Sequence, residues 1–449
     1  MEEAAAEEAH TGPRTDDGRQ PAPADQPTLT PAGYRERAAE AEAAAVLRTA
    51  RALLVEGPKG CGKTWFAKRF ARSEALLEQD RAALTLAQAA PSRLLDGAVP
   101  RLLDEWQRAP GLWAAVRGAC DARGAAGQFI LTGSAVPADD LTRHSGALRV
   151  QRLALRTMSL FEQGLSSEAV SLAGLLDGVP AEGPPTGQHL PETVDALCRG
   201  GWPAFGAQLP PADAARALRS YLDDIARADI RQVDGVERDP IRVSALLRSL
   251  ARNVATAASL NKLAGEASAD APLSRHTVRS YLDALERLHI TEPLRAWPTH
   301  LRSRAPLLTS PKHHFCDPSL AAAALRATPR GLLADLKTLG LLFESLVIRE
   351  LRIYAQAADA EVYSFTDAAG AEADAIVDAR DGRWIAVEAK LGGDEQIDSA
   401  ARSLLAASKK VDERRMGTPS ALVVITAADG YAYQRRDGVS VVPLFTLGP

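Results

Sequence analysis

A glycine-rich stretch near the start of the chain constrains the fold more than any other sequence feature. It lies between an apolar run at 51–56 and a run with helical spacing of apolar residues at 65–71, and its residues are Gly57, Pro58, Lys59, Gly60, Cys61, Gly62, Lys63 and Thr64. This is the spacing of a Walker A phosphate loop, in which glycines let backbone N–H groups turn towards a phosphate. The order of strand, loop and helix predicts the first unit of a parallel α/β sheet.

These eight residues also predict which ligand the loop binds. Lys63 is expected to neutralise phosphate charge, and Thr64 is expected to place its hydroxyl on Mg²⁺. ATP and Mg²⁺ are therefore the expected cofactors. The alternative is a chance glycine-rich turn, which would have to match every element of the motif in the right order.

Composition indicates a folded protein of several domains without a general attraction for nucleic acid or membranes. The chain has 449 residues, of which 46% are hydrophobic and 24% charged, and its net charge is −4. The cysteines at 61, 120, 198 and 316 have neither metal-site nor disulfide spacing. No apolar run approaches the roughly 18 residues of a membrane span, and the first residues lack the pattern of a secretion signal. We therefore expect a cytoplasmic protein that does not enter the membrane.

An acidic pair after the next apolar run predicts the second half of a nucleotide site. Asp104 and Glu105 directly follow residues 99–103. Asp104 is expected to belong to the Mg²⁺ shell, and Glu105 to orient or deprotonate the attacking water. An acidic helix start is the alternative interpretation of the same pair.

Two further apolar runs, 128–134 and 148–155, predict more strands of the same sheet. Thr132 or Ser134, at the end of the first run, is expected to sense the γ-phosphate. A site of this kind is often completed by an arginine of a neighbouring subunit, which would require a homo-oligomer. The candidates are Arg143, Arg149 and Arg152, and an ordinary surface role is the alternative for each.

Six motifs together resemble one known family. They are EGPKGCGKT (56–64), LDEWQ (103–107), GQFILTGS (127–134), HSG (144–146), MSLFE (158–162) and GGWP (200–203). The chain resembles bacterial and archaeal AAA-type ATPases that carry a C-terminal domain of unknown function, over nearly all of its length after Leu29. Leu148 departs from the pattern, because the family often has glycine there, and this leaves the role of Arg149 open.

The resemblance implies an α/β fold class with several parts. A P-loop NTPase parallel sheet of the AAA type is followed by a helical lid and a winged helix. The chain then ends in an α/β domain similar to the PD-(D/E)xK restriction-endonuclease-like fold. The expected boundaries are a disordered tail at 1–29, the ATPase core at 30–157, the lid at 158–235, the winged-helix-like domain at 236–315 and the C-terminal domain at 316–449.

The middle of the chain carries helical patterns that predict the winged helix. Ser274 is expected to cap a helix over 274–288, and residues 258–265 predict its upstream partner. If the module reads DNA, the residues that enter the groove are Arg275, His276, Arg279 and Ser280, with a basic wing of Arg295, Arg302, Arg304 and Lys312. A purely architectural winged helix is equally consistent. In the helical segment 212–230, Arg227 and Asp229 are expected to face the nucleotide, a neighbouring subunit or solvent.

Four charged residues near the end of the chain predict a second chemical site. Glu344 lies on an apolar-periodic helix, Asp374 starts a strand, and Glu388 and Lys390 share a face of another strand because strand side chains alternate. Asp374 and Glu388 are expected to bind Mg²⁺, and Lys390 to position or activate a water for phosphodiester cleavage. A charged surface, or nucleic-acid binding without cutting, is the alternative.

The sequence as a whole predicts an ATPase that hydrolyses ATP with Mg²⁺ to drive or switch a C-terminal DNA-interacting domain. An ATP-regulated DNA nuclease is one alternative. The other is a non-cleaving adaptor that uses ATP to hold a protein or nucleic-acid partner.

Overall fold

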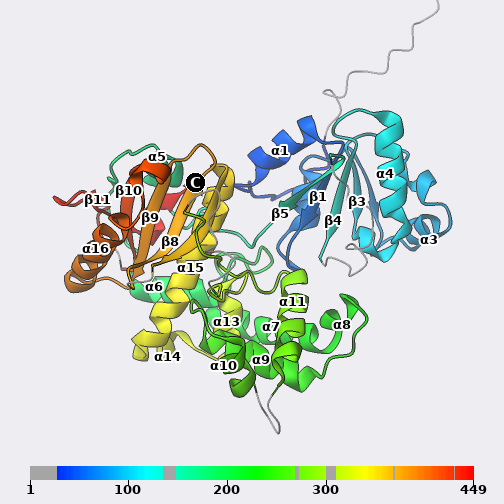
Figure 1. Ribbon diagram of the computed structural model, residues 1–449. Helices are drawn as coiled ribbons and strands as arrows, with labels where there is room; N and C mark the ends of the chain where they lie inside the picture. The colour runs from blue at the N-terminus through cyan, green and yellow to red at the C-terminus, as the bar shows by residue number, and fades with distance from the viewer. Residues whose placement is uncertain (1–27, 135–147, 268–272, 300–309, 368–369, 429) are drawn as a thin grey trace, which may run out of the picture.

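The chain folds into two sheet-containing domains and a helical unit, which lies between them in the sequence (Figure 1). The computed structural model describes residues 28–134, 148–267, 273–299, 310–367, 370–428 and 430–449. Most of the expected disordered tail lies outside these ranges. In Figure 1 the N-terminal sheet lies on the right, the C-terminal sheet on the left and the helical unit below both.

The N-terminal domain contains a five-stranded sheet in the order β2-β3-β4-β1-β5, and every neighbouring pair is parallel. Its strands are β1 (Ala52–Glu56), β2 (Ser73–Leu76), β3 (Arg101–Asp104), β4 (Phe129–Gly133) and β5 (Val150–Ala154). The parallel sheet expected from the sequence is thus confirmed. The short strand β2 was not predicted, because its four residues are mostly half-exposed and lack a buried pattern.

Helices cover both faces of this sheet because the strands bury side chains on both sides. Leu53 and Val55 of β1 pack with one set of helices, whereas Ala52 and Leu54 pack with the other. The first set is α1 (Glu40–Thr49) and α2 (Lys63–Lys68), and the second is α3 (Arg81–Ala89), α4 (Gly111–Arg123) and the 3₁₀ helices η1 (Pro91–Leu95) and η2 (Trp106–Arg108).

The helical unit begins after residue 189. Its elements are α6 (Leu190–Arg199), α7 (Pro211–Asp224), the π-helix η4 (Ile225–Asp229), α8 (Ile230–Gln232), α9 (Pro240–Arg252), α10 (Leu260–Glu266), α11 (Arg275–Arg287), α13 (Pro318–Ala324) and α14 (Pro329–Ala334). Ser274 caps α11 as predicted, since its side chain accepts a hydrogen bond from the backbone N–H of Thr277. After α11, antiparallel bridges join Thr291 to Phe315 and Leu294 to Lys312. The order of α9, α10, α11 and two bridged segments is the order of elements in a winged helix. The winged-helix assignment stays a prediction.

The C-terminal domain contains a six-stranded mixed sheet in the order β11-β12-β10-β9-β8-β7. Its elements are α15 (Leu336–Ala357), β7 (Ala360–Thr366), β8 (Glu372–Ala379), β9 (Trp384–Lys390), α16 (Asp394–Ser408), α17 (Glu413–Met416), β10 (Ala421–Thr426), β11 (Tyr433–Gln434), β12 (Ser440–Pro443) and the 3₁₀ helix η5 (Leu444–Thr446). The strands and helix expected at 375–377, 384–390, 396–407, 421–426 and 439–444 are present. The likeness to a restriction endonuclease stays a prediction.

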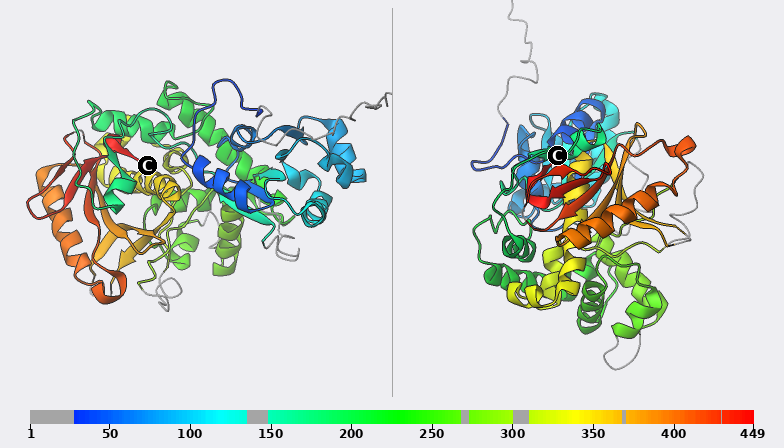
Figure 2. Two further views of the ribbon diagram at one scale, coloured as in Figure 1. Left: turned by 90° about the horizontal axis from the view of Figure 1, so that it is seen from above. Right: turned by 90° about the vertical axis from the view of Figure 1, so that its left-hand side faces the viewer.

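Helices α15 and α16 lie on opposite faces of this sheet (Figures 1 and 2). Alternation along β9 explains the arrangement, because Ile385 and Val387 pack with α15 while Trp384 and Ala386 pack with α16. The sheet is therefore buried on both sides.

Two segments pack outside the domains expected for them. The strand β6 (Val170–Ser171) pairs with β13 (Leu447–Gly448) at the end of the chain, and α5 (Leu172–Leu176) packs on α15 and β9. This part of the expected lid therefore lies on the C-terminal domain. Conversely, α13 packs on α7 and α9, so the helical unit continues beyond the boundary expected after 315.

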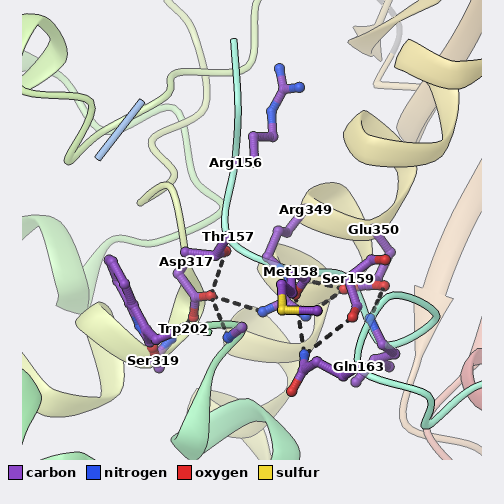
Figure 3. Close-up of polar contacts among 12 residues, drawn as sticks. Arg156, Thr157, Met158, Ser159, Gln163, Trp202, Asp317, Ser319, Arg349 and Glu350 are labelled. Atoms are coloured by element: carbon purple, nitrogen blue, oxygen red, sulfur yellow. Dashed lines mark hydrogen bonds and ion pairs between the residues drawn. The ribbon is translucent and has the colours of Figure 1, made fainter. Parts of the chain in front are cut away.

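A buried carboxylate joins all three parts (Figure 3). Asp317 is fully buried, and its Oδ2 accepts hydrogen bonds from Thr157 Oγ1 at 2.7 Å, from the Gly201 N–H at 2.9 Å and from Arg349 Nη1 at 2.9 Å. Thr157 follows the last strand of the N-terminal sheet, Gly201 belongs to the helical unit and Arg349 lies on α15. Arg349 also pairs with the buried Glu350, which accepts from the backbone N–H of Leu160.

We expect Arg349→Met to destabilise the protein by about 3–5 kcal/mol, because it leaves two buried carboxylates without their cation. The measurement is the midpoint of the first transition in urea unfolding followed by circular dichroism. Arg380→Met is the matched control, since Arg380 pairs with Asp359 at an exposed position, and it should unfold close to the wild type. Equal midpoints for the two variants would contradict the role given to Asp317 and Arg349.

Candidate functional site

The phosphate loop lies at the carboxyl end of β1, where the glycines are required by geometry. A Cβ on Gly57 would lie 2.1 Å from the backbone O of Leu155, so no larger residue fits there. Gly62 has φ +99°, a conformation that other residues rarely adopt. The backbone of the loop is thus held in a shape that only this composition allows.

Lys63 and Thr64 make polar contacts within the phosphate loop and with the next strand, and their predicted roles towards phosphate and Mg²⁺ stay predictions. The Nζ of Lys63 is buried and donates to the backbone oxygens of Gly57 and Pro58, each at 2.9 Å. The Thr64 hydroxyl donates to Asp104 Oδ1 at 2.8 Å, across from β1 to β3. Thr64 and Asp104 therefore bring two hard oxygen ligands together, a donor set that fits Mg²⁺.

Glu105 follows Asp104 in a left-handed conformation, with φ 54° and ψ 47°. Its carboxylate accepts hydrogen bonds from Gln107 Nε2 and from Ser134 Oγ, the latter at 3.3 Å. Burial raises the pKa of Glu105 above its ordinary value, and the neighbouring ammonium of Lys63 opposes that rise in part. Gln107 and Ser134 therefore hold the Glu105 carboxylate at the wall of the cavity.

The two candidate sensors occupy different depths. The Thr132 hydroxyl is fully buried, donates to Asp104 Oδ1 at 2.6 Å and accepts from the backbone N–H of Glu105 at 3.2 Å. Thr132 therefore orients the acidic pair from behind, whereas Ser134 lines the cavity.

A cavity of about 820 Å³ lies above the loop and is walled by three parts of the chain. The N-terminal segment contributes Tyr34 and Arg37, and the helical unit contributes Trp202 and Pro203. A Cβ on Gly60 would lie 3.7 Å from the Trp202 ring. Sequence reasoning noted Trp202 only as part of a motif and missed Tyr34 and Arg37, because no local pattern marks them.

The helical unit also contacts the phosphate loop directly. Lys59 Nζ pairs with Asp229 Oδ1 at 2.5 Å, and the Tyr221 hydroxyl donates to the Lys59 carbonyl at 3.4 Å. Asp229 is buried at the end of the π-helix η4, while Arg227 is exposed. Of the two residues expected to face the nucleotide or a neighbour, Asp229 alone touches the loop among the described contacts.

The arginine candidates lie elsewhere. The Arg149 carbonyl accepts a hydrogen bond from the backbone N–H of Ala52, the first residue of β1. Arg149 therefore lies at the amino ends of the strands, whereas the phosphate loop lies at their carboxyl ends. Its guanidinium pairs with Asp121 at 2.6 Å. Arg149 is therefore not part of the cavity of its own chain, and a role towards a neighbouring subunit stays a prediction. Leu148 before it has φ 65°, which explains a preference for glycine there.

The other two arginines are placed as follows. Arg152 pairs with Glu56 at 2.6 Å. Arg143 and the HSG motif lie outside the described residues.

The four residues of the predicted second site do come together. Lys390 Nζ contacts Glu388 and lies 3.5 Å from Asp374 Oδ2. Burial, followed by the negative charge of Asp374, raises the pKa of both Glu344 and Glu388. A fifth residue, Lys312, joins the group: its Nζ lies 2.8 Å from Glu344 Oε1 and 3.7 Å from Asp374 Oδ1.

The sequence predicts Lys312 in a basic wing that contacts DNA. In the structure its ammonium instead points into the protein and pairs with Glu344. Burial opposes the charge of Lys312, but Glu344 and Asp374 outweigh it and raise the lysine pKa. Among the described residues, no group of three or more His, Cys, Asp or Glu side chains is arranged to hold a metal ion. In this structure the carboxylates of the cluster pair with Lys312 and Lys390, and Mg²⁺ binding there stays a prediction.

The residues expected to enter a DNA groove are only partly free to do so. Arg275, His276 and Arg279 are exposed on α11, whereas Ser280 accepts a hydrogen bond from Arg238 at 3.3 Å. Arg295 is exposed, and Arg302 and Arg304 lie outside the described residues. DNA binding by this face stays a prediction.

Comparisons with known proteins agree with the geometry of the first site. An AAA domain model matches residues 49–163. Residues 49–163 are therefore similar to an AAA domain. Models of two domains of unknown function match later parts of the chain, DUF8612 at 191–331 and DUF4143 at 339–447. The family model for the end of the chain thus agrees with the expected C-terminal domain of unknown function.

Similarity to individual proteins is weak. The Walker-type ATPase PABY2304 of Pyrococcus abyssi is 12% identical, with a TM-score of 0.41, and the match covers 67% of this chain and 99% of that one. A search of curated proteins found no match. In the described part of the chain, no helix combines the length and apolar character needed to cross a membrane.

We expect Asp229→Asn to loosen η4 and α8, because it removes the charge that pairs with Lys59. Since the Lys59 side chain is half-exposed, amide exchange at 225–232 should speed up by no more than about fivefold. Hydrogen exchange with mass spectrometry measures this. Asp224→Asn, at an exposed position one turn earlier, is the control and should exchange like the wild type. Identical exchange in both variants would show that the ion pair holds nothing in place.

Proposed function

We propose that this chain binds ATP with Mg²⁺ in the cavity above the phosphate loop and hydrolyses it. The observation that carries the proposal is the meeting of Lys63, Thr64, Asp104 and Glu105 at the carboxyl ends of β1 and β3. The match of this segment to an AAA domain model supports it. Each of these residues has the chemistry that phosphoryl transfer to water requires.

The chain's own residues divide the work in the following way. The loop backbone and Lys63 bind the phosphates, and Lys63 must leave the carbonyls of Gly57 and Pro58 to do so. Thr64 and Asp104 would hold Mg²⁺, which supplies positive charge to the phosphate oxygens when bound. Thr132 keeps Asp104 in place through its 2.6 Å hydrogen bond.

Glu105 orients the attacking water and accepts its proton. Gln107 and Ser134 fix the Glu105 carboxylate for this step. Water enters from the cavity, which Glu105 and Ser134 both line.

We propose further that ATP turnover switches the position of the helical unit and, through it, the C-terminal domain. Trp202 of that unit walls the cavity, and Asp229 pairs with Lys59 of the loop. A nucleotide in the cavity therefore contacts or displaces parts of both the N-terminal domain and the helical unit. The proposed target of this switch is DNA, and the exposed Arg275, His276 and Arg279 of α11 in the helical unit support it.

An ATP-regulated DNA nuclease is the second candidate. The convergence of Glu344, Asp374, Glu388 and Lys390 favours it, and the inward position of Lys312 opposes it. Nicking of duplex DNA that needs Mg²⁺ and is lost in Asp374→Ala would support the nuclease. Tight ATP binding without turnover would instead favour the adaptor.

We expect Lys63→Ala to abolish ATP binding, whereas Glu105→Gln should bind ATP and lose turnover by about 10²–10⁴-fold, because only the proton acceptor is removed. Binding of a fluorescent ATP analogue and steady-state phosphate release separate the two effects. Glu395→Gln is the control, an exposed glutamate on α16, and should behave as the wild type. A Glu105→Gln enzyme with wild-type turnover would overturn the role of Glu105.

We expect kcat/KM for ATP to fall on the acid side at a pH above the ordinary glutamate value of about 4.5. Glu105 accepts a proton only when ionised, and burial raises its pKa, so protonation removes activity earlier on acidification than for an exposed glutamate. A pH profile of kcat/KM measures this limb. The residual activity of Glu105→Gln should lack it, and a limb that persists in this variant would belong to another group.

A further inference from the structure

The carboxylate cluster of the C-terminal domain contains one residue that its own domain does not supply. Glu344 comes from α15, Asp374 from β8, and Glu388 and Lys390 from β9. Lys312 comes instead from the bridged segment that follows α11, where it pairs with Leu294. The cluster is therefore also a contact between the helical unit and the C-terminal domain.

Lys312 occupies the space between two carboxylates. Its Nζ is 2.8 Å from Glu344 Oε1 and 3.7 Å from Asp374 Oδ1, and its side chain is 14% exposed. Lys390 pairs with the third carboxylate, Glu388, and its Nζ also lies 3.5 Å from Asp374 Oδ2. The two lysines together leave only one formal negative charge in excess among the three carboxylates.

Charge balance explains why a cation must be present in this place. Buried carboxylates this close repel one another and lose hydration, so an ionised group needs a cation or a proton to remain there. Asp374 is further fixed by the backbone N–H of Ala389, which donates to its Oδ2 at 2.9 Å. A divalent cation that bridged Glu344 and Asp374 would need the position that the Lys312 ammonium fills.

We propose that Lys312 is a built-in cation that holds its segment on the C-terminal domain and keeps divalent cations out of the cluster. A divalent cation binds to Glu344, Asp374 and Glu388 only when Lys312 leaves. The helical unit that carries Lys312 also contacts the phosphate loop through Asp229. Displacement of that unit is therefore the event that opens the cluster.

This inference uses the same carboxylates as the nuclease candidate, and it requires neither ATP hydrolysis nor cleavage. The test is a titration of the full chain with Mn²⁺ in the absence of nucleotide, in which electron paramagnetic resonance measures free Mn²⁺. The variants are Lys312→Met, Asp374→Asn and the double variant. Lys337→Met is the matched control, because Lys337 is exposed on α15 and lies outside the cluster.

Lys312→Met should bind one Mn²⁺ per chain more than the wild type, and the double variant should lose that gain. Lys337→Met should bind as the wild type does. Asp374→Asn alone should leave the wild-type amount unchanged, because no cation enters while Lys312 is in place. If Lys312→Met gains no Mn²⁺, the proposal is overturned.

A second measurement tests the proposal even if Lys312→Met does not fold. A loss of bound Mn²⁺ in Asp374→Asn, compared with the wild type, would mean that the cluster takes a metal with Lys312 present, and this also overturns the proposal. Lys312→Gln, which keeps a donor without the charge, then replaces the methionine variant and should show the same gain. DNA nicking and phosphate release, measured on the same samples, report separately on the nuclease and ATPase proposals.

Discussion

The burial of one carboxylate, Asp317, sets the arrangement of the whole molecule. A fully buried charge is tolerated only when a cation and hydrogen-bond donors surround it. Its donors come from the segment after β5, from the helical unit and from α15 (Figure 3). No one part of the chain can satisfy this group alone, so the three parts dock together or leave a costly charge without partners.

The same docking brings the helical unit against both chemical sites. Near the phosphate loop it supplies Trp202 and Asp229, and at the carboxylate cluster it supplies Lys312. Trp202 is itself tied to the buried carboxylate, because its indole N–H donates to Ser319, which in turn donates to Asp317. A shift of this unit would therefore change contacts at both sites, and this is the physical route that the proposed switch uses.

Sequence reasoning succeeded where the signal is local. Four features depend on residues within a few positions of one another. They are the phosphate loop, the acidic pair at the end of β3, the cap at Ser274 and the shared face of Glu388 and Lys390. It gave no signal where partners are far apart along the chain. The docking of β6 on β13, the inward turn of Lys312 and the place of Arg149 at the amino ends of the strands each depend on pairing between segments with no common pattern.

By itself the sequence determined that the chain carries a glycine-rich phosphate loop on a parallel sheet, because glycine spacing and strand periodicity act over short distances. Only the tertiary structure decided that Trp202 lines the cavity above the phosphate loop and that a lysine of the helical unit pairs with a carboxylate of another domain. Burial and charge pairing are properties of the packed chain. They are settled by which surfaces meet, and residue order alone does not specify that.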